Sequence, residues 1–178
     1  MGRIVVAYQT KYGTTRTYAE WIAEETGADL LEFKRAKLEQ LLRYDTIVYC
    51  GGLYAGGMLG FSRIRKQYAA LIKGKRLIVA AVGATLQREK ALEEVKNVNF
   101  TPEMKERVPL FLLRGGLAYN KMGVVDRVLM ALLVASIRRQ NPQTLDVDSK
   151  GILGSYKKTV SFVNRRQIVP IVEAVRAE

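Results

Sequence analysis

The sequence has 178 residues, of which 48% are apolar, so it can bury a substantial core and is not a disordered segment. It contains no histidine, which excludes histidine-based triads and histidine metal sites, and we expect no metal centre. Its single cysteine, Cys50, excludes an intramolecular disulfide, fits a reducing compartment and is expected to be a small buried side chain. The net charge of +12 favours anionic partners.

Strand and helix patterns alternate along most of the chain. In chain order, they predict a strand at Ile4–Tyr8, a helix at Thr14–Thr26, a strand at Asp29–Phe33, a helix at Lys37–Leu42, a strand at Thr46–Cys50, a helix around Ser62–Ile72, a strand at Leu77–Val82, a helix at Lys90–Val95 and a strand at Val108–Leu113. Near-continuous apolar strands separated by helices indicate a parallel sheet with helices on both faces. Short right-handed crossovers then give a doubly wound, five-stranded α/β fold, which we expect to form one domain over residues 1–178.

The turn between the first strand and the first helix has the composition of an anion-binding loop. It consists of Thr10-Lys11-Tyr12-Gly13-Thr14-Thr15. A strand that leads directly into a helix leaves backbone N–H groups unpaired at the helix start, where the helix dipole also favours negative charge. Three threonine hydroxyls around one glycine add further donors. The sequence therefore predicts a phosphate site here, as part of a nucleotide or flavin pocket.

Three more loops that contain glycine follow strands of the predicted sheet, at residues 51–57, 83–88 and 114–121. Ligands of doubly wound sheets bind beyond the carboxyl ends of the strands, so these loops would form a floor for a flat ligand. No G-x-G-x-x-G follows the first strand, and the chain has no G-x-x-x-x-G-K-[ST]. A Rossmann dinucleotide site and a P-loop NTPase are therefore disfavoured.

The first loop resembles the phosphate-binding loop of the flavodoxin family, which surrounds the phosphate of flavin mononucleotide (FMN) with hydroxyls and backbone amides. The order of elements agrees with that family along the whole chain, and the resemblance implies the sheet order 2-1-3-4-5 and FMN as the cofactor. It also implies that the second and third loops hold the isoalloxazine ring, with Tyr54 placed to stack on it. The implied cofactor-binding residues are Thr10, Lys11, Tyr12, Gly13, Thr14, Thr15, Gly52, Leu53, Tyr54, Ala55, Gly56, Gly83, Ala84 and Thr85.

A second segment gives a closer resemblance. Gly115-Gly116-Leu117-Ala118-Tyr119-Asn120-Lys121, followed by Asp126-Arg127 and an apolar helix, resembles the insertion of the flavodoxin-type protoporphyrinogen oxidases of bacteria. This resemblance implies Tyr119 as a further cofactor contact. It also implies an oxidoreductase that passes electrons between a small-molecule redox substrate and a quinone. We interpret Asp126 and Arg127 as a helix-start charge and a structural ion pair, and no catalytic residue is identified.

The insertion after the fifth strand covers about residues 114–158 and contains an apolar helix at about 124–139. Between residues 114 and 166, ten bases and three acids give a net charge of +7. An apolar helix flanked by bases is typical of a segment that lies on an anionic membrane surface. The same pattern would also serve in a homo-oligomer interface or in the domain core. A short strand at Thr159–Val163 and a helix that begins after Asn164 follow the insertion.

Three functions fit these features. An FMN-dependent oxidoreductase is favoured, and the alternatives are a non-enzymatic flavodoxin electron carrier and a flavin-free anion-binding module. Carriers of the flavodoxin family are usually acidic, so the net charge of +12 weighs against a carrier. Since no signal peptide is evident, we expect a cytoplasmic location or a peripheral one on the inner face of the membrane, and no nucleic-acid partner.

Overall fold

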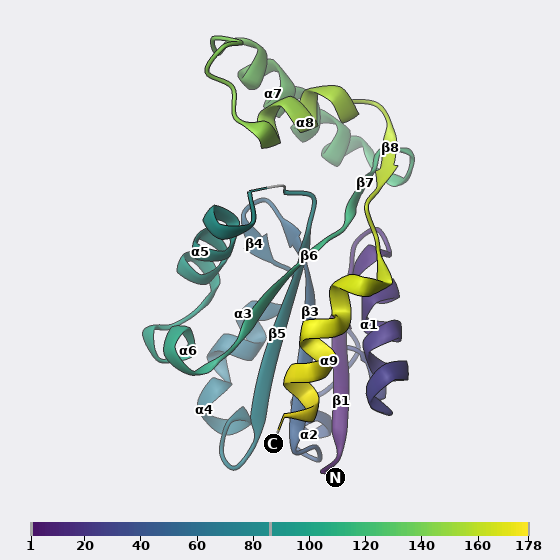
Figure 1. The fold of residues 1–178 in the computed structure, drawn as a ribbon, viewed down its shortest axis with the longest axis vertical. Coiled ribbons are helices and arrows are strands. Elements are labelled where there is room, and N and C mark those ends of the chain that lie inside the picture. The colour runs from purple at the N-terminus through teal and green to yellow at the C-terminus, as the bar shows by residue number, and fades with distance from the viewer. Residues whose placement is uncertain (1, 86, 178) are drawn as a thin grey trace.

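Five parallel strands form the centre of the structure, a computed structural model that describes residues 2–85 and 87–177 (Figure 1). They are β1 (Ile4–Gln9), β2 (Asp29–Glu32), β3 (Thr46–Tyr54), β5 (Arg76–Gly83) and β6 (Leu110–Arg114). Their order in the sheet is β2-β1-β3-β5-β6, which confirms the predicted order 2-1-3-4-5 of a flavodoxin-like fold. In register, Val6 of β1 pairs with Val48 of β3, which pairs with Ile78 of β5.

Helices cover both faces of this sheet (Figure 1). One face carries α1 (Thr14–Thr26) and α9 (Val169–Arg176), and the other carries α3 (Phe61–Lys66), α4 (Tyr68–Leu71), α5 (Arg88–Asn99) and α6 (Pro102–Arg107), while α2 (Leu38–Leu41) follows β2. Successive side chains of a strand point to opposite faces, so Val5 packs in one apolar cluster and Val6 in the other. Cys50 is fully buried, as expected, and burial raises the pKa of its thiol to about 12.

The third strand is longer than predicted. The sequence places its end at Cys50, but β3 continues through Gly51 and Gly52 to Tyr54. Gly51 pairs with Gln9, and Gly52 pairs with Val82, so the glycine segment keeps neighbours on both sides. The segment predicted as a free loop is therefore partly a strand, because its backbone is paired even though glycine contributes no apolar side chain.

The same segment ends in a tight hairpin that was not predicted. β4 (Gly57–Met58) pairs antiparallel with the end of β3. Its two turn residues, Ala55 and Gly56, have positive φ angles of 48° and 81°. A two-residue turn with two positive φ angles matches the twist of a hairpin, but alanine adopts this conformation less readily than glycine.

Helix boundaries also differ from the prediction. The helix expected around Ser62–Ile72 is divided into α3 and α4 at Gln67, whose φ of −114° is not helical. The helix expected after Asn164 begins as the short 3-10 helix η2 (Arg165–Ile168), and α9 begins at Val169. α6 was not predicted, since its sequence is mostly charged and shows no apolar periodicity.

The insertion projects beyond the carboxyl ends of the parallel strands, at the end of the molecule opposite both chain termini (Figure 1). It consists of β7 (Gly116–Ala118), the 3-10 helix η1 (Tyr119–Lys121), α7 (Val124–Arg138), α8 (Val147–Ser155) and β8 (Thr159–Ser161). β7 and β8 pair antiparallel and form the two-stranded stem of the insertion. No helix within residues 2–85 and 87–177 is long and apolar enough to cross a membrane.

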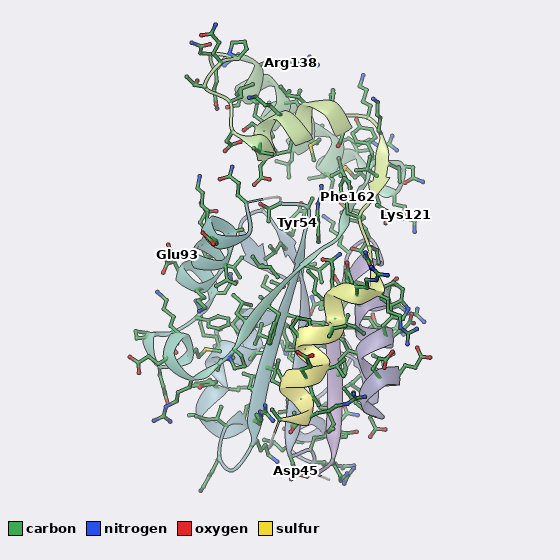
Figure 2. The ribbon with its side chains drawn as sticks, viewed as in Figure 1. Asp45, Tyr54, Glu93, Lys121, Arg138 and Phe162 are labelled. Carbon is green, nitrogen blue, oxygen red and sulfur yellow. The ribbon has the colours of Figure 1, made fainter. Side chains whose placement is uncertain are left out.

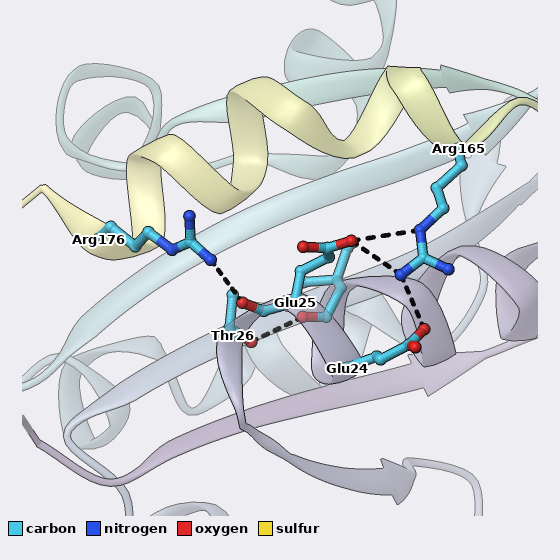
Figure 3. A network of polar contacts seen from close by, with 6 residues as sticks. Glu24, Glu25, Thr26, Arg165 and Arg176 are labelled. Carbon is cyan, nitrogen blue, oxygen red and sulfur yellow. Dashed lines mark hydrogen bonds and ion pairs between the residues drawn. The ribbon is translucent and has the colours of Figure 1, made fainter.

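Polar contacts fix the C-terminal segment to α1 (Figure 3). The Nη2 atom of Arg165 lies 2.8 Å from a carboxylate oxygen of Glu24 and 2.8 Å from one of Glu25. At the other end of the segment, Arg176 donates a hydrogen bond of 2.8 Å to the backbone carbonyl of Glu25. α9 is thus held along α1 from both of its ends.

A buried hydrogen-bond centre joins the two ends of the insertion to the sheet. The Tyr18 hydroxyl donates to the carbonyl of Arg114 at 2.7 Å and accepts from the backbone N–H of Asn164 at 3.2 Å. It also accepts from Nε2 of Gln167 at 2.7 Å, and Oε1 of Gln167 accepts from the N–H of Arg114 at 2.7 Å. Because Arg114 precedes the insertion and Asn164 follows it, these contacts fix the point where the insertion leaves the sheet.

Candidate functional site

A cavity of about 380 Å³ lies at the carboxyl ends of β1, β3, β5 and β6, and α7 closes its outer side. Tyr54 marks this end of the sheet, which faces the insertion, and Asp45 lies at the opposite end (Figure 2). The cavity therefore occupies the position where doubly wound sheets bind ligands.

The loop from β1 to α1 forms one wall of the cavity. Gly13 precedes α1 with a φ of 101°, and no side chain caps the helix. Thr10 Oγ1 accepts a hydrogen bond of 3.0 Å from the Gly13 N–H, which closes the turn. The first turn of α1 contains no acidic residue. Its N–H groups and the hydroxyls of Thr14 and Thr15 at the cavity wall therefore retain the capacity to bind an anion.

Glycines at the strand ends form the floor. A Cβ atom on Gly52 would lie 3.1 Å from Oγ1 of Thr15, and one on Gly115 would lie 3.0 Å from Val82. A Cβ on Gly83 would lie 2.8 Å from Leu53. Larger residues at these positions would press against the loops or fill the cavity, so the glycines leave a flat floor.

Most of the residues implied by the flavodoxin resemblance lie together in this cavity. Those that line it are Thr10, Lys11, Tyr12, Thr14, Thr15, Gly52, Leu53, Tyr54, Ala55, Gly83 and Ala84. The other four lie beside it. Gly13 closes the first turn, and Gly56 lies in the β3–β4 turn. Thr85 lines a neighbouring cavity of about 210 Å³ and donates to Asp148 at 2.5 Å, and Tyr119 packs edge-on against Tyr156 with ring centroids 5.9 Å apart.

The insertion adds residues to the site that the sequence interpretation did not include. They are Gly115, Gly116, Leu117, Met122, Asp126, Leu129, Met130 and Leu133, and Leu59 and Val82 join them from the sheet side. Apart from Asp126 they are apolar, so the outer wall of the cavity is a hydrophobic surface. The signal in the sequence was the excess of apolar residues in this helix, which is more than one narrow stripe requires.

Asp126 joins the insertion to two loops of the cavity. Its Oδ1 atom lies 2.6 Å from Nζ of Lys11 and accepts a hydrogen bond of 2.7 Å from the Tyr54 hydroxyl. Its Oδ2 atom accepts from the Tyr12 hydroxyl. Among the described contacts, the ion pair of Asp126 is made with Lys11, 115 residues away in the sequence, and not with Arg127 as the sequence interpretation had it. Nζ of Lys11 also lies 3.8 Å from the centre of the Tyr54 ring.

The electrostatics of this cluster keep its groups in their ordinary charge states at neutral pH. The hydrogen bond from Lys11, followed by those from Tyr12 and Tyr54, lowers the pKa of Asp126 to about 2. The same contact raises the pKa of Lys11 above its ordinary value, and burial together with Asp126 raises that of Tyr12 to about 12. All three pKa shifts lead away from neutrality, so the cluster fastens α7 over the cavity and is poorly suited to proton transfer at neutral pH.

A doubly wound parallel sheet, with an anion-binding loop after its first strand and a glycine floor at the neighbouring strand ends, defines the flavodoxin-like class of proteins. A family model described as a flavodoxin domain matches residues 5–144, and the chain belongs to this family. FMN is its cofactor, as the sequence predicts.

Solved structures with similar folds have low sequence identity to this chain. A flavodoxin, WrbA-like protein from Agrobacterium tumefaciens is 19% identical with a TM-score of 0.46, over 71% of this chain and 88% of that chain. The Trp repressor binding protein from Bacillus subtilis is 16% identical with a TM-score of 0.47, over 64% of this chain and 85% of that chain. Comparison with curated proteins finds no significant match.

Proposed function

We propose that this protein is an FMN-dependent oxidoreductase whose substrate is a small redox compound with an apolar ring system, of the quinone or protoporphyrinogen type. The proposal is supported by one observation: the anion-binding loop, the glycine floor and the apolar residues of α7 all line the same cavity. When bound, FMN supplies one- or two-electron redox chemistry, and the protein supplies binding, orientation and electrostatics.

The residues present fit FMN. The phosphate would be held by Thr10, Thr14 and Thr15 together with the N–H groups at the start of α1. The flavin ring would lie against the glycine floor beside Tyr54. The positive charge of Lys11 is neutralised by Asp126, so hydroxyls and amides bind the phosphate in a loop whose own charge is balanced.

The substrate class is inferred from the outer wall. Leu129, Met130 and Leu133 of α7 line the cavity, and such a wall favours a substrate with an apolar ring system. The pKa values of Asp126, Lys11 and Tyr12 are all shifted away from neutrality. These residues would therefore bind and orient the cofactor or substrate without transferring protons. Protons that accompany electron transfer would then be exchanged with solvent or with the substrate.

Titration of the purified protein with FMN tests the first part of the proposal. Bound flavin is followed by its visible absorbance, and we expect a saturable complex. Thr14→Val removes a hydroxyl from the cavity wall, and loss of a hydrogen bond to a charged group weakens binding roughly 10- to 150-fold. Thr17→Val, three residues further along α1 and outside the cavity, is the matched control and should bind FMN as the wild type does.

Turnover assays test the second part. The FMN-loaded protein should pass electrons from protoporphyrinogen to a quinone over many cycles. Reduction by a ferredoxin reductase without turnover of either compound would indicate an electron carrier instead. Failure to take up FMN would exclude both redox functions and leave an anion-binding module.

A further inference from the structure

One side of α7 exposes a continuous row of branched aliphatic side chains. We name this row the α7 stripe, and it consists of Val124, Val125, Val128, Leu129, Leu132 and Leu133. Their exposed fractions range from 43% at Leu133 to 79% at Val124. Six such residues on one helix form a contiguous apolar surface, unlike the single exposed apolar residues that are normal on soluble proteins.

The stripe lies on one side of α7, and only Leu129 and Leu133, at its edge, also reach the cavity wall. Its members lie at positions i, i+1, i+4, i+5, i+8 and i+9, which is one side of an α-helix. The buried residues of α7, Asp126, Val134 and Ile137, lie on the other side. The four members that do not line the cavity, Val124, Val125, Val128 and Leu132, are 52–79% exposed.

Basic residues surround the stripe. Exposed bases lie at both ends of α7 and along the returning segment: Lys121, Arg127, Arg138, Arg139, Lys150, Lys157 and Lys158. None of these bases forms an ion pair with any residue in the ranges 2–85 and 87–177. Arg138 lies at the outer end of the insertion, far from the sheet (Figure 2). The exposed apolar row thus lies in an insertion rich in bases that form no ion pair within the described residues, and of these bases Arg127, Arg138 and Lys157 lie over tyrosine rings.

We propose that the α7 stripe docks this protein onto the surface of an anionic lipid bilayer. A 15-residue helix is about 22 Å long, too short to span the hydrocarbon core, so it would lie in the plane of the interface. Unpaired bases on both flanks would meet anionic headgroups while the aliphatic side chains enter the acyl boundary. A second copy of the chain is the weaker occupant, because two insertions of net charge +5 would face each other.

The docked surface adjoins the cavity. Leu129 and Leu133 belong to the stripe and also line the cavity wall. In a consequence that rests on the proposed function, an apolar redox substrate dissolved in the bilayer would reach the cavity along these two side chains without crossing water.

Vesicle flotation tests the docking directly. We would compare vesicles of phosphatidylcholine alone with vesicles that contain about 30% phosphatidylglycerol, because the proposal requires anionic headgroups. The wild type should float with the anionic vesicles, and raised salt should weaken this binding. Val128→Glu combined with Leu132→Glu places two charges in the stripe without altering the cavity lining, and should reduce binding roughly tenfold or more.

Val98→Glu is the matched control, since Val98 is 54% exposed on α5, outside the insertion, and its variant should float as the wild type does. Flotation does not require FMN, and FMN titration of each variant reports separately on the proposed function. The docking proposal is overturned if the wild type remains in solution, or if it binds neutral and anionic vesicles equally. It is also overturned if light scattering shows a dimer that the double variant dissociates while neither protein binds vesicles.

Discussion

The Tyr18 hydroxyl offers the sharpest test of how the insertion is anchored. We consider Tyr18→Phe, which keeps the ring and removes only the oxygen. The ring is fully buried and packs edge-on against Trp21, so the apolar contacts should survive. The substitution removes the hydroxyl that donates a hydrogen bond to the Arg114 carbonyl. The same hydroxyl accepts hydrogen bonds from the Asn164 N–H and the Gln167 amide.

The magnitude follows from these three bonds. The amide of Gln167 keeps its hydrogen bond of 3.1 Å to the Phe162 carbonyl. The N–H of Asn164 loses the only hydrogen bond it makes within the described residues. Net hydrogen bonds contribute about 1 kcal/mol each and an unsatisfied buried group costs about 1–3 kcal/mol, so we expect a loss of about 2–4 kcal/mol in the free energy of unfolding. For a chain of this size, that corresponds to a lower Tm by roughly 6–12 °C.

Urea denaturation followed by circular dichroism measures this loss, with Tyr68→Phe as the control. Tyr68 is 4% exposed, but its hydroxyl makes no hydrogen bond to any residue in the described ranges, so its variant should change stability by less than about 0.5 kcal/mol. Equal stabilities of the two variants would refute the hydrogen-bond centre. Tyr18→Phe should also accelerate amide exchange in β7 and β8, because the ends of their stem are no longer fixed.

The remaining predictions concern the cavity and its cover. Asp126→Asn removes the charge that fastens α7, and we expect amide exchange in the first turn of α7 to accelerate roughly tenfold or more at neutral pH, whereas an unchanged rate would contradict the contact. In the wild type, the folded-state pKa of Asp126 is depressed to about 2, so this fastening is complete above about pH 4 and should be lost as pH falls from there toward 2, measured by the same exchange. Gly115→Val should abolish FMN binding while Gly123→Val, whose Cβ would meet nothing within 4 Å, retains it, as spectroscopic titration would show. Ala55→Gly should raise the free energy of unfolding by about 1 kcal/mol in urea, because it relieves a positive φ; a loss of stability would show that the turn is unstrained.

The sheet and its helices could be predicted because their signals are local. Continuous apolar strands such as Leu77–Val82 are buried on both faces, and the amphipathic spacing of α1 places its bounds at Thr14 and Thr26, as predicted. The β3–β4 hairpin gave no such signal. Glycine contributes neither alternation nor apolar surface, so the segment after Cys50 resembled a loop although its backbone pairs on both sides.

The candidate site divides in the same way. The anion loop and the glycine floor follow from the positions where strands end, and parallel strands bring these ends together whatever the loops contain. The contacts of Asp126 with Lys11 and Tyr54 depend instead on how the insertion folds back over the sheet. Their sequence separations of 115 and 72 residues leave no local pattern to detect. α8 was missed for a related reason, since its apolar residues show almost no helical periodicity.

The distribution of charge connects the cavity with the surface beside it. The insertion, residues 114–158, carries +5 of the total charge of +12, so a large share of the excess lies at the end of the molecule that holds the cavity. Asp126, one of the three acids in that region, forms an ion pair with Lys11, so its charge does not offset the charge of the neighbouring bases. A positive field at this end would attract the phosphate of FMN toward the loop and anionic headgroups toward the α7 stripe. Since both attractions act on the same end, the protein would approach a bilayer with its cavity facing the lipid, and neutralising Arg138 and Arg139 should weaken vesicle binding more than FMN binding.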